Sequence, residues 1–571
     1  MVTDSVAESR DIVGLVTHWP SPRAYLFLAI ATLVCLGPFS GRAFHVDDTL
    51  FIWAAQQIHR HPFDPYGFQL VWDVTHVSMA QTTQNPPLSS YYAAMIGSLL
   101  GWSERALHSG FILVAIALVL GTYRLALNFT RSPLLATLAT LLTPGILVSA
   151  SSVMCDTMML ALWMWAAIFW IEGLKTEKIH FLVASGILIT ASALTKYFGV
   201  ALIPLLLTYG VMRRRRAGMY ILYLNIPVAV LFAYQLWTTK LYGHGLLTGA
   251  AEFASSQRAA TQGSPIAMAI VGLSFTGGCA LLGWTFAVLL WSRLHVAIGA
   301  IIGGLAAVAA LMGWVDMGLQ LGGGPAERFH LLTGIQLTLC VSGGISLLGL
   351  ALRDVWKNRD ADSLFLCLWI FGTFVFAAFV NYTVNARSVL PLIPAAGILL
   401  ARRLDELRLS TGRSLDTYVT IILLTSGVFS LWIAAGDSSL ANSARTAAIQ
   451  INEKTHGKGS TVWFEGHWGF QYYMESLGSK PLDFGNPQLA PGDIIVIPEN
   501  NIQLREIPPQ YVASRDSLVF AQNLGTTTIS HELGAGFYSS YWGPLPYAVG
   551  PVAPERYWIL RLAASSARRP Q

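Results

Sequence analysis

The chain has 571 residues, of which 54% are hydrophobic and only 12% are charged, and its mean hydropathy is +0.52. Soluble domains carry roughly 25% charged residues, so this composition excludes an ordinary soluble protein and predicts an integral membrane protein. The net charge of +5 does not indicate nucleic-acid binding. Basic clusters such as residues 213–216 flank apolar segments, where anionic headgroups and membrane orientation account for them.

Cysteine, histidine and glycine patterns exclude several kinds of site. The five cysteines lie in or beside apolar segments and form no CxxC pair, so neither a disulfide framework nor a thiolate metal site is expected. The histidines of the first polar loop lack the i, i+4 spacing of a zinc site. No GxxxxGK[ST] loop occurs, and a group-transfer reaction would therefore need an activated donor that partitions into the membrane.

The apolar segments predict a polytopic α-helical membrane protein, because a span needs about 20 apolar residues. Basic residues gather between alternate spans, which places the N-terminus in the cytoplasm and residues 437–571 outside. A long outer loop covers 42–105, and a second one covers 239–265. About thirteen spans are predicted, near 24–41, 106–126, 133–150, 157–173, 179–195, 198–212, 218–238, 266–291, 295–315, 329–350, 363–380, 388–401 and 416–436.

Two domains follow from this division. Residues 1–436 form the transmembrane domain, and its first outer loop is predicted to contain helices at 48–59 and 87–100, the second apolar enough to lie in the interface. Residues 437–571 have the composition of a small extracytoplasmic α/β domain. Strands are predicted at 460–464, 493–497 and 556–562, with a helix at 470–476.

The adjacent acids Asp47 and Asp48 follow the first span, at the expected membrane surface. Two carboxylates beside a bilayer are costly unless they are solvated, paired or used. A helix N-terminus explains one of them, since Asp caps free amides there. A general base acting on an acceptor hydroxyl or amine is the alternative. Asp156 lies at the outer end of another span, where a cap or a pairing with Lys196 or Arg387 would each account for it.

Three basic residues, Lys196, Arg387 and Arg328, lie at outer ends of spans, against the positive-inside trend. Snorkelling of each side chain to the headgroups is the simpler explanation. Convergence on a phosphate is the alternative, since Arg and Lys are the side chains that most often bind phosphate.

The acids and bases occur with other short motifs in a fixed order along the chain. That order is Asp47-Asp48, Asn85-Pro86-Pro87-Leu88, Ser103-Glu104-Arg105, Asp156, Leu194-Thr195-Lys196, and Ala386-Arg387 before a Leu-Pro-Leu-Ile-Pro run. Over about 40–405 the chain thereby resembles the glycosyltransferase family 39 type of GT-C enzymes, which includes protein O-mannosyltransferases and lipid A aminoarabinose transferases. It departs from that family in having Asp48 where a Glu is usual, and Tyr197 where a Gly commonly follows the Lys.

The resemblance implies an inverting glycosyltransferase that takes a sugar from a polyprenyl-phosphate donor and passes it to a lipid, glycan or protein acceptor. Asp47 would act as the base with Asp48 or Asp156 in support, while Lys196 and Arg387, joined by Arg328, would bind the donor phosphate. Such a reaction requires no cofactor and leaves room for a divalent cation. The rival interpretation is a transporter or lipid flippase that uses the same charges as a relay, which would place them at the bilayer midplane.

Overall fold

The computed structural model describes residues 21–72, 74–260, 264–317, 330–411, 415–455 and 459–563. Within these ranges eight helices are long and apolar enough to cross a membrane, or nine if one bent pair counts as a single span. The polytopic helical fold is therefore confirmed. The count of thirteen spans is not confirmed, because several apolar segments form shorter or broken helices.

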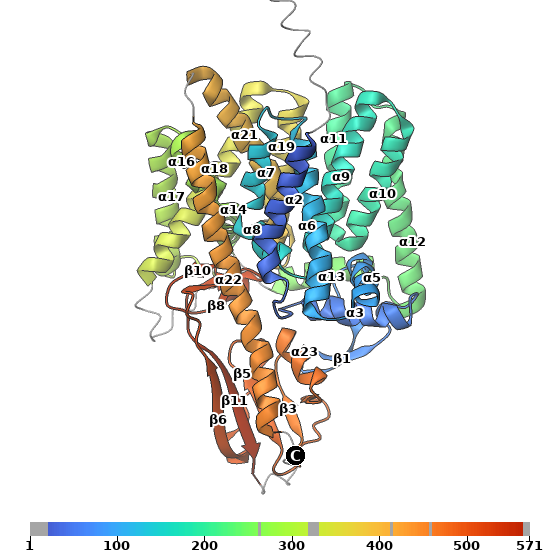
Figure 1. The fold of residues 1–571 in the computed structure, drawn as a ribbon, viewed down its shortest axis with the longest axis vertical. Coiled ribbons are helices and arrows are strands. Elements are labelled where there is room, and N and C mark those ends of the chain that lie inside the picture. Colours follow the sequence, from blue (N-terminus) through green and yellow to red (C-terminus); the bar gives the residue numbers. More distant parts are fainter. Residues whose placement is uncertain are drawn as a thin grey trace, which may run out of the picture.

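The bundle occupies the upper part of Figure 1, and a smaller domain hangs below it. The main helices of the bundle are α2 (Pro22–Leu36), α6 (Glu104–Ala126), α7 (Pro133–Leu141), α8 (Pro144–Ala150), α9 (Cys155–Thr176), α10 (Ile179–Thr195), α11 (Leu202–Arg214), α12 (Asn225–Tyr242), α14 (Pro265–Ala280), α17 (Arg293–Leu311), α18 (His330–Asn358), α19 (Ala361–Val375), α21 (Leu392–Thr411) and α22 (Asp416–Thr455).

Two predicted spans are interrupted. The 133–150 segment bends by 63° between α7 and α8, where Pro144 starts the second helix. The prediction of one span over 266–291 was wrong. Helix α14 ends at Ala280 and is followed by two short helices, α15 (Leu282–Thr285) and α16 (Ala287–Leu290). The break lies at Leu281 (φ +56°), beside a close backbone contact with α18: a Cβ on Gly277 would lie 1.9 Å from the Cys340 carbonyl oxygen.

The last span does not end at 436. Helix α22 continues without a break to Thr455, over 40 residues, so the predicted domain boundary falls inside a helix. A helix of that length spans about 60 Å, twice the thickness of a bilayer core. Figure 1 shows it running from the bundle into the smaller domain, so one continuous helix connects the two.

The C-terminal domain contains a five-stranded mixed sheet in the order β4-β3-β5-β11-β6. The predicted strands are confirmed as β3 (Val462–Phe464), β5 (Ile494–Pro498) and β11 (Glu555–Leu562), and the predicted helix as α23 (Trp468–Ser476). Strand β3 is parallel to β4 (Lys480–Pro481) and β5, whereas β11 is antiparallel to β5 and to β6 (Val512–Phe520). Apolar residues of β3, β5, α22 and α23 form one core cluster.

The first outer loop lies at the same end of the bundle as the C-terminal domain (Figure 1). Its two predicted helices are confirmed as α3 (Asp48–Arg60) and α5 (Leu88–Leu100). Between them lies a hairpin that the sequence did not predict, made of β1 (Gln69–Trp72) and β2 (Thr75–Ser78). The second outer loop forms α13 (Leu246–Ala260), whose Phe253 ring lies 5.4 Å from that of Tyr382.

Two buried carboxyls make the stability of the C-terminal domain depend on pH. Burial raises the pKa of Glu465 and of Glu555 to about 7, against about 4.3 in an unfolded chain. Between these values the folded domain binds more protons than the unfolded chain, so its free energy of unfolding falls as the pH rises through 7. We expect greater protection from hydrogen exchange at pH 5 than at pH 8, after correction for intrinsic rates.

The matched variant for this prediction carries Glu465→Gln and Glu555→Gln, which keep the shape of the side chains and remove their titration. It should show nearly equal protection at the two pH values. A wild-type domain with pH-independent protection, or a double variant that keeps the difference, would contradict the assignment.

Candidate functional site

Asp47 pairs with Arg387, although 340 positions separate them in the chain. The guanidinium Nη1 of Arg387 lies 2.8 Å from Asp47 Oδ2, and the Asp47 side chain is 28% exposed. Asp47 occupies the N-cap position of α3 but makes no side-chain capping bond. The helix-cap explanation of Asp47 is therefore wrong, and its carboxylate faces a cation in a partly open position.

The chain holds Asp47 through a strained turn. Val46, directly before it, has φ +46°, a left-handed conformation that is rare for a β-branched residue. Such strain costs of order 1–3 kcal/mol and persists only where surrounding contacts enforce it. Those contacts are present, because the His45 amide donates to Asp48 Oδ2 at 2.9 Å and the Asp48 amide donates to the His45 carbonyl at 3.1 Å.

Asp48 has a different environment from its neighbour. Its side chain is fully buried, and its second oxygen accepts the Val153 amide at 2.8 Å. Burial raises the pKa of Asp48 to about 6, although Arg42 and the two amides oppose this shift. With both oxygens bonded to backbone, Asp48 holds the turn against residue 153 and is not placed to meet a substrate.

Asp156 pairs with Lys196, one of the two partners expected for it. Lys196 Nζ lies 2.5 Å from Asp156 Oδ1, and the other carboxylate oxygen of Asp156 is buried without a hydrogen-bond partner. Asp156 lies in the first turn of α9, and Lys196 ends α10. The turn after Lys196 is tight: a Cβ on Gly199 would lie 2.5 Å from the Ala193 amide nitrogen.

The two ion pairs meet at residues 154–156. Arg387 Nη1 lies 3.1 Å from the Met154 sulfur, and Cys155 donates a weak bond to Asn85 Oδ1 at 3.6 Å, from the Asn-Pro-Pro-Leu motif. Of the five residues expected to converge, Asp47, Asp156, Lys196 and Arg387 lie together on the side of the bundle that faces the C-terminal domain, whereas the Asp48 carboxylate is directed away to backbone amides. Arg328 lies outside the described residues.

A short helix with a capped N-terminus holds the backbone around Arg387. It belongs to α20 (Ala386–Val389), whose N-cap residue Asn385 accepts the Ser388 amide at 2.8 Å. The Arg387 side chain is 15% exposed, and its Nε is buried without a hydrogen-bond partner. Arg387 therefore keeps one buried donor beyond its contact with Asp47.

An apolar cavity of about 430 Å³ begins next to Lys196 in the chain. It follows the 3-10 turn η2 (Tyr197–Ala201) and α11, and it reaches α9 and α19. Trp163 is two helical turns beyond Asp156, on the same face of α9. Leu368, at the cavity wall, is 38% exposed. The cavity is therefore lined without any of the four charged side chains and connects to their cluster through Tyr197, the residue after Lys196.

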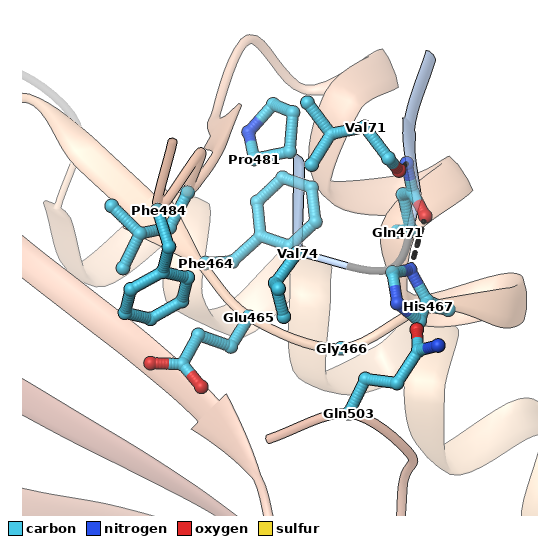
Figure 2. A pocket seen from close by; sticks show the side chains of 11 residues that line it. Val71, Val74, Phe464, Glu465, Gly466, His467, Gln471, Pro481, Phe484 and Gln503 are labelled. Atoms are coloured by element: carbon cyan, nitrogen blue, oxygen red, sulfur yellow. Dashed lines mark hydrogen bonds between the residues drawn. The ribbon is translucent and has the colours of Figure 1, made fainter. Parts of the chain in front are cut away.

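A second pocket lies between the β1–β2 hairpin and the C-terminal domain, lined by Glu465, His467 and Gln471 among others (Figure 2). Its volume is about 10 Å³, room for roughly one water molecule. A sugar does not fit there, so the charged cluster with its apolar cavity is the better candidate site. Within the described ranges no group of three or more His, Cys, Asp or Glu side chains is placed to hold a metal ion.

A third ion pair next to the cluster was not predicted. Arg42 Nη1 lies 2.8 Å from Asp437 Oδ2, and both side chains are fully buried. Tyr538 donates to the same Asp437 oxygen at 2.9 Å, and Arg42 also donates to Ser151 at 2.7 Å. The sequence held one signal for this pair, an acid directly after the last apolar span and an arginine directly after the first.

Solved structures that resemble the chain share little sequence with it. ArnT from Cupriavidus metallidurans bound to undecaprenyl phosphate has 13% identity and a TM-score of 0.44, over 84% of this chain and 94% of that one. The Archaeoglobus fulgidus oligosaccharyltransferase AglB, in complex with an inhibitory peptide and a dolichol-phosphate, has 12% identity and a TM-score of 0.47, over 83% and 69%.

The mycobacterial arabinofuranosyltransferase AftD has 14% identity and a TM-score of 0.39, over 94% of this chain and 40% of that one. No curated protein sequence matches the chain. Residues 84–237 match a family model described as dolichyl-phosphate-mannose-protein mannosyltransferase, and this segment contains Asn85, Asp156 and Lys196. The match confirms the resemblance to GT-C membrane glycosyltransferases that the order of the motifs predicts.

Proposed function

We propose that the chain is an inverting membrane glycosyltransferase that moves a sugar from a polyprenyl-phosphate donor to a lipid, glycan or protein acceptor on the outer face of the membrane. The observation that carries this proposal is the meeting of two ion pairs, Asp47–Arg387 and Asp156–Lys196, beside an apolar cavity. The matched family is named for a sugar on dolichyl phosphate, a donor with the same two parts, an anionic head and an apolar chain.

Lys196 and Arg387 would hold the donor phosphate. Their charged ends contact the same short segment at 154–156, so one phosphate between them can meet both. Asp156 would orient Lys196, while the free Nε of Arg387 offers a further donor. The polyprenyl chain would lie along the cavity that is lined by Tyr197 and by the partly exposed Leu368 of α19.

Asp47 would act as the general base. An acceptor hydroxyl attacks the anomeric carbon, its oxygen forms the new glycosidic bond, and its proton passes to Asp47. The bond from the anomeric carbon to the phosphate oxygen breaks, and the phosphate leaves with the electron pair. Lys196 and Arg387 stabilise the charge that develops on it. Asp48, with both oxygens bonded to amides, would position this machinery without touching substrate.

The position of the charges disfavours a transport relay. Asp47, Asp156, Lys196 and Arg387 lie at helix ends or in short turns. A relay would need such groups at depth within the bilayer. Together with the expected orientation, which has the N-terminus in the cytoplasm, this position supports chemistry at the outer membrane surface.

The donor site is tested by binding of undecaprenyl phosphate to the purified protein in nanodiscs. Lys196→Gln and Arg387→Gln keep hydrogen-bond donors toward their acid partners but remove the charge. Each should raise the Kd by about 10- to 100-fold, the effect of losing one charge-assisted hydrogen bond.

Lys454→Gln is the matched control, because Lys454 is a half-exposed lysine in the C-terminal domain paired with Asp516. It should bind as the wild type does. Equal Kd values for all four proteins would reject Lys196 and Arg387 as the phosphate site. A wild-type protein that does not bind undecaprenyl phosphate would count against the proposed donor class.

A further inference from the structure

The C-terminal domain reaches the charged cluster through residues 537–542. The Ala386 amide donates to the Phe537 carbonyl at 2.9 Å, and the Ser540 amide donates to the Val384 carbonyl at 2.8 Å. The Thr383 hydroxyl lies 3.0 Å from that of Ser539. These bonds attach the domain to the backbone that leads directly into Arg387.

Tyr538 lies at the centre of this contact. The guanidinium carbon of Arg387 is 5.8 Å from the centroid of its ring, and its hydroxyl donates to Asp437 at 2.9 Å. Asp437 is held in turn by Arg42 and by the hydroxyl of Thr528. The Tyr538 side chain is buried, 6% exposed. The hydroxyl end of the Tyr538 ring is therefore held by the buried Arg42–Asp437 ion pair, and the face of the ring contacts the Arg387 guanidinium.

We propose that Tyr538 of the C-terminal domain is a positioning residue for Arg387, so that the donor phosphate site is completed by a domain outside the membrane bundle. This inference rests on the proposed function. An arginine side chain has many accessible rotamers, and the Asp47 carboxylate restrains only the Nη1 end of the Arg387 guanidinium. The ring of Tyr538 supplies a flat surface that limits the other end, since guanidinium groups stack on aromatic faces.

Two substitutions at Tyr538 separate the ring from the hydroxyl. Tyr538→Leu removes the aromatic face, and the Kd for undecaprenyl phosphate should rise roughly five- to thirtyfold, the range of a desolvated cation–π contact. Tyr538→Phe keeps the face and should bind close to the wild-type value. The matched control is Tyr511→Leu, the same change in the turn before β6, which should leave binding unchanged.

A double-mutant cycle distinguishes positioning from general stability. If Tyr538 acts through Arg387, then Tyr538→Leu should weaken binding in the wild-type background and have little further effect once Arg387→Gln is present. Against Lys196→Gln, whose partner is Asp156, the two effects should multiply. Thermal unfolding of each variant is recorded in parallel, so that a loss of fold is recognised.

Each outcome decides the inference. Tyr538→Leu binding as tightly as wild type would overturn it, and so would an equal loss with and without Arg387. Loss of binding in Tyr538→Phe as large as in Tyr538→Leu would assign the effect to the hydroxyl and overturn the ring contact. These results leave the proposed function standing, provided that wild-type binding depends on Lys196. A wild-type protein without affinity for undecaprenyl phosphate would instead reject the proposed function, and the inference with it.

Discussion

Asp47→Asn is expected to lower glycosyl transfer by about 10²- to 10⁴-fold, the usual contribution of a general base. The amide keeps the shape of the side chain but cannot accept a proton. Donor binding should be unchanged or tighter, because Arg387 loses the carboxylate 2.8 Å away and becomes free for the phosphate. The measurement is release of undecaprenyl phosphate from undecaprenyl-phosphate sugars, in membranes that retain the native acceptors.

A loss of turnover without a loss of donor affinity distinguishes a general base from a residue that the fold requires. A variant that merely unfolds would lose both. Asp516→Asn provides the control, because Asp516 is an exposed acid on β6, far along the chain from the cluster, and its side chain is 70% exposed. Near-normal turnover in Asp47→Asn would show that Asp47 is not the general base and only neutralises the charge of Arg387.

The sequence predicted which residues gather but not how they pair. The predicted membrane topology put Asp47, Asp156, Lys196 and Arg387 on one side of the bundle, because each follows or precedes an apolar span whose direction the basic residues predict. Which acid meets which base depends on helix packing, and Asp156 had two equal partners in the sequence. The structure pairs it with Lys196.

The adjacent acids show the same limit more clearly. Asp47 and Asp48 look equivalent in sequence, and capping explained either one. A left-handed Val46 and the start of α3 send one carboxylate toward Arg387 and the other into the protein, against the amides of His45 and Val153. Local propensity favours neither arrangement, since Val46 adopts its conformation only under the surrounding contacts.

Element boundaries failed where a contact outside the segment decides them. Apolar composition gave 266–291 one continuous span, but α14 ends at Ala280, directly after the close approach of Gly277 to α18. Hydropathy ended the last span at 436, yet α22 continues as a polar helix to Thr455 because the C-terminal domain packs on it. The hairpin β1–β2 was likewise not predicted, because its residues do not alternate strongly between apolar and polar.

The second large effect concerns the buried pair of Arg42 and Asp437. Arg42→Met leaves a carboxylate in a fully buried position without its cation, which should cost about 3–5 kcal/mol. All five cysteines are free and buried, so unfolding is followed by their reaction with a thiol-specific fluorophore on heating. The midpoint of Arg42→Met should lie well below that of the wild-type protein.

Two further variants give this result its meaning. Arg445 and Glu104 also join α22 to the region of the first loop, at 3.2 Å, but their side chains are 29% and 24% exposed. Arg445→Met should therefore cost less than about 1 kcal/mol. Adding Asp437→Asn to Arg42→Met removes the unpaired charge but keeps an acceptor for Tyr538 and Thr528, and most of the lost stability should return.

Recovery in the double variant would mean that the buried charge, and not the lost packing of Arg42, causes the instability. It would also separate stability from function, because in that variant Tyr538 keeps its hydrogen-bond acceptor and Arg387 keeps its aromatic surface. The affinity for the donor should then return together with the stability of the fold. If the double variant stays as unstable as Arg42→Met, the packing of Arg42 against Ser151 and the loop matters more than its charge. If Arg42→Met is no less stable than Arg445→Met, the buried pair does not hold the C-terminal domain to the bundle, and the bonds between residues 383–386 and 537–540 must hold it instead.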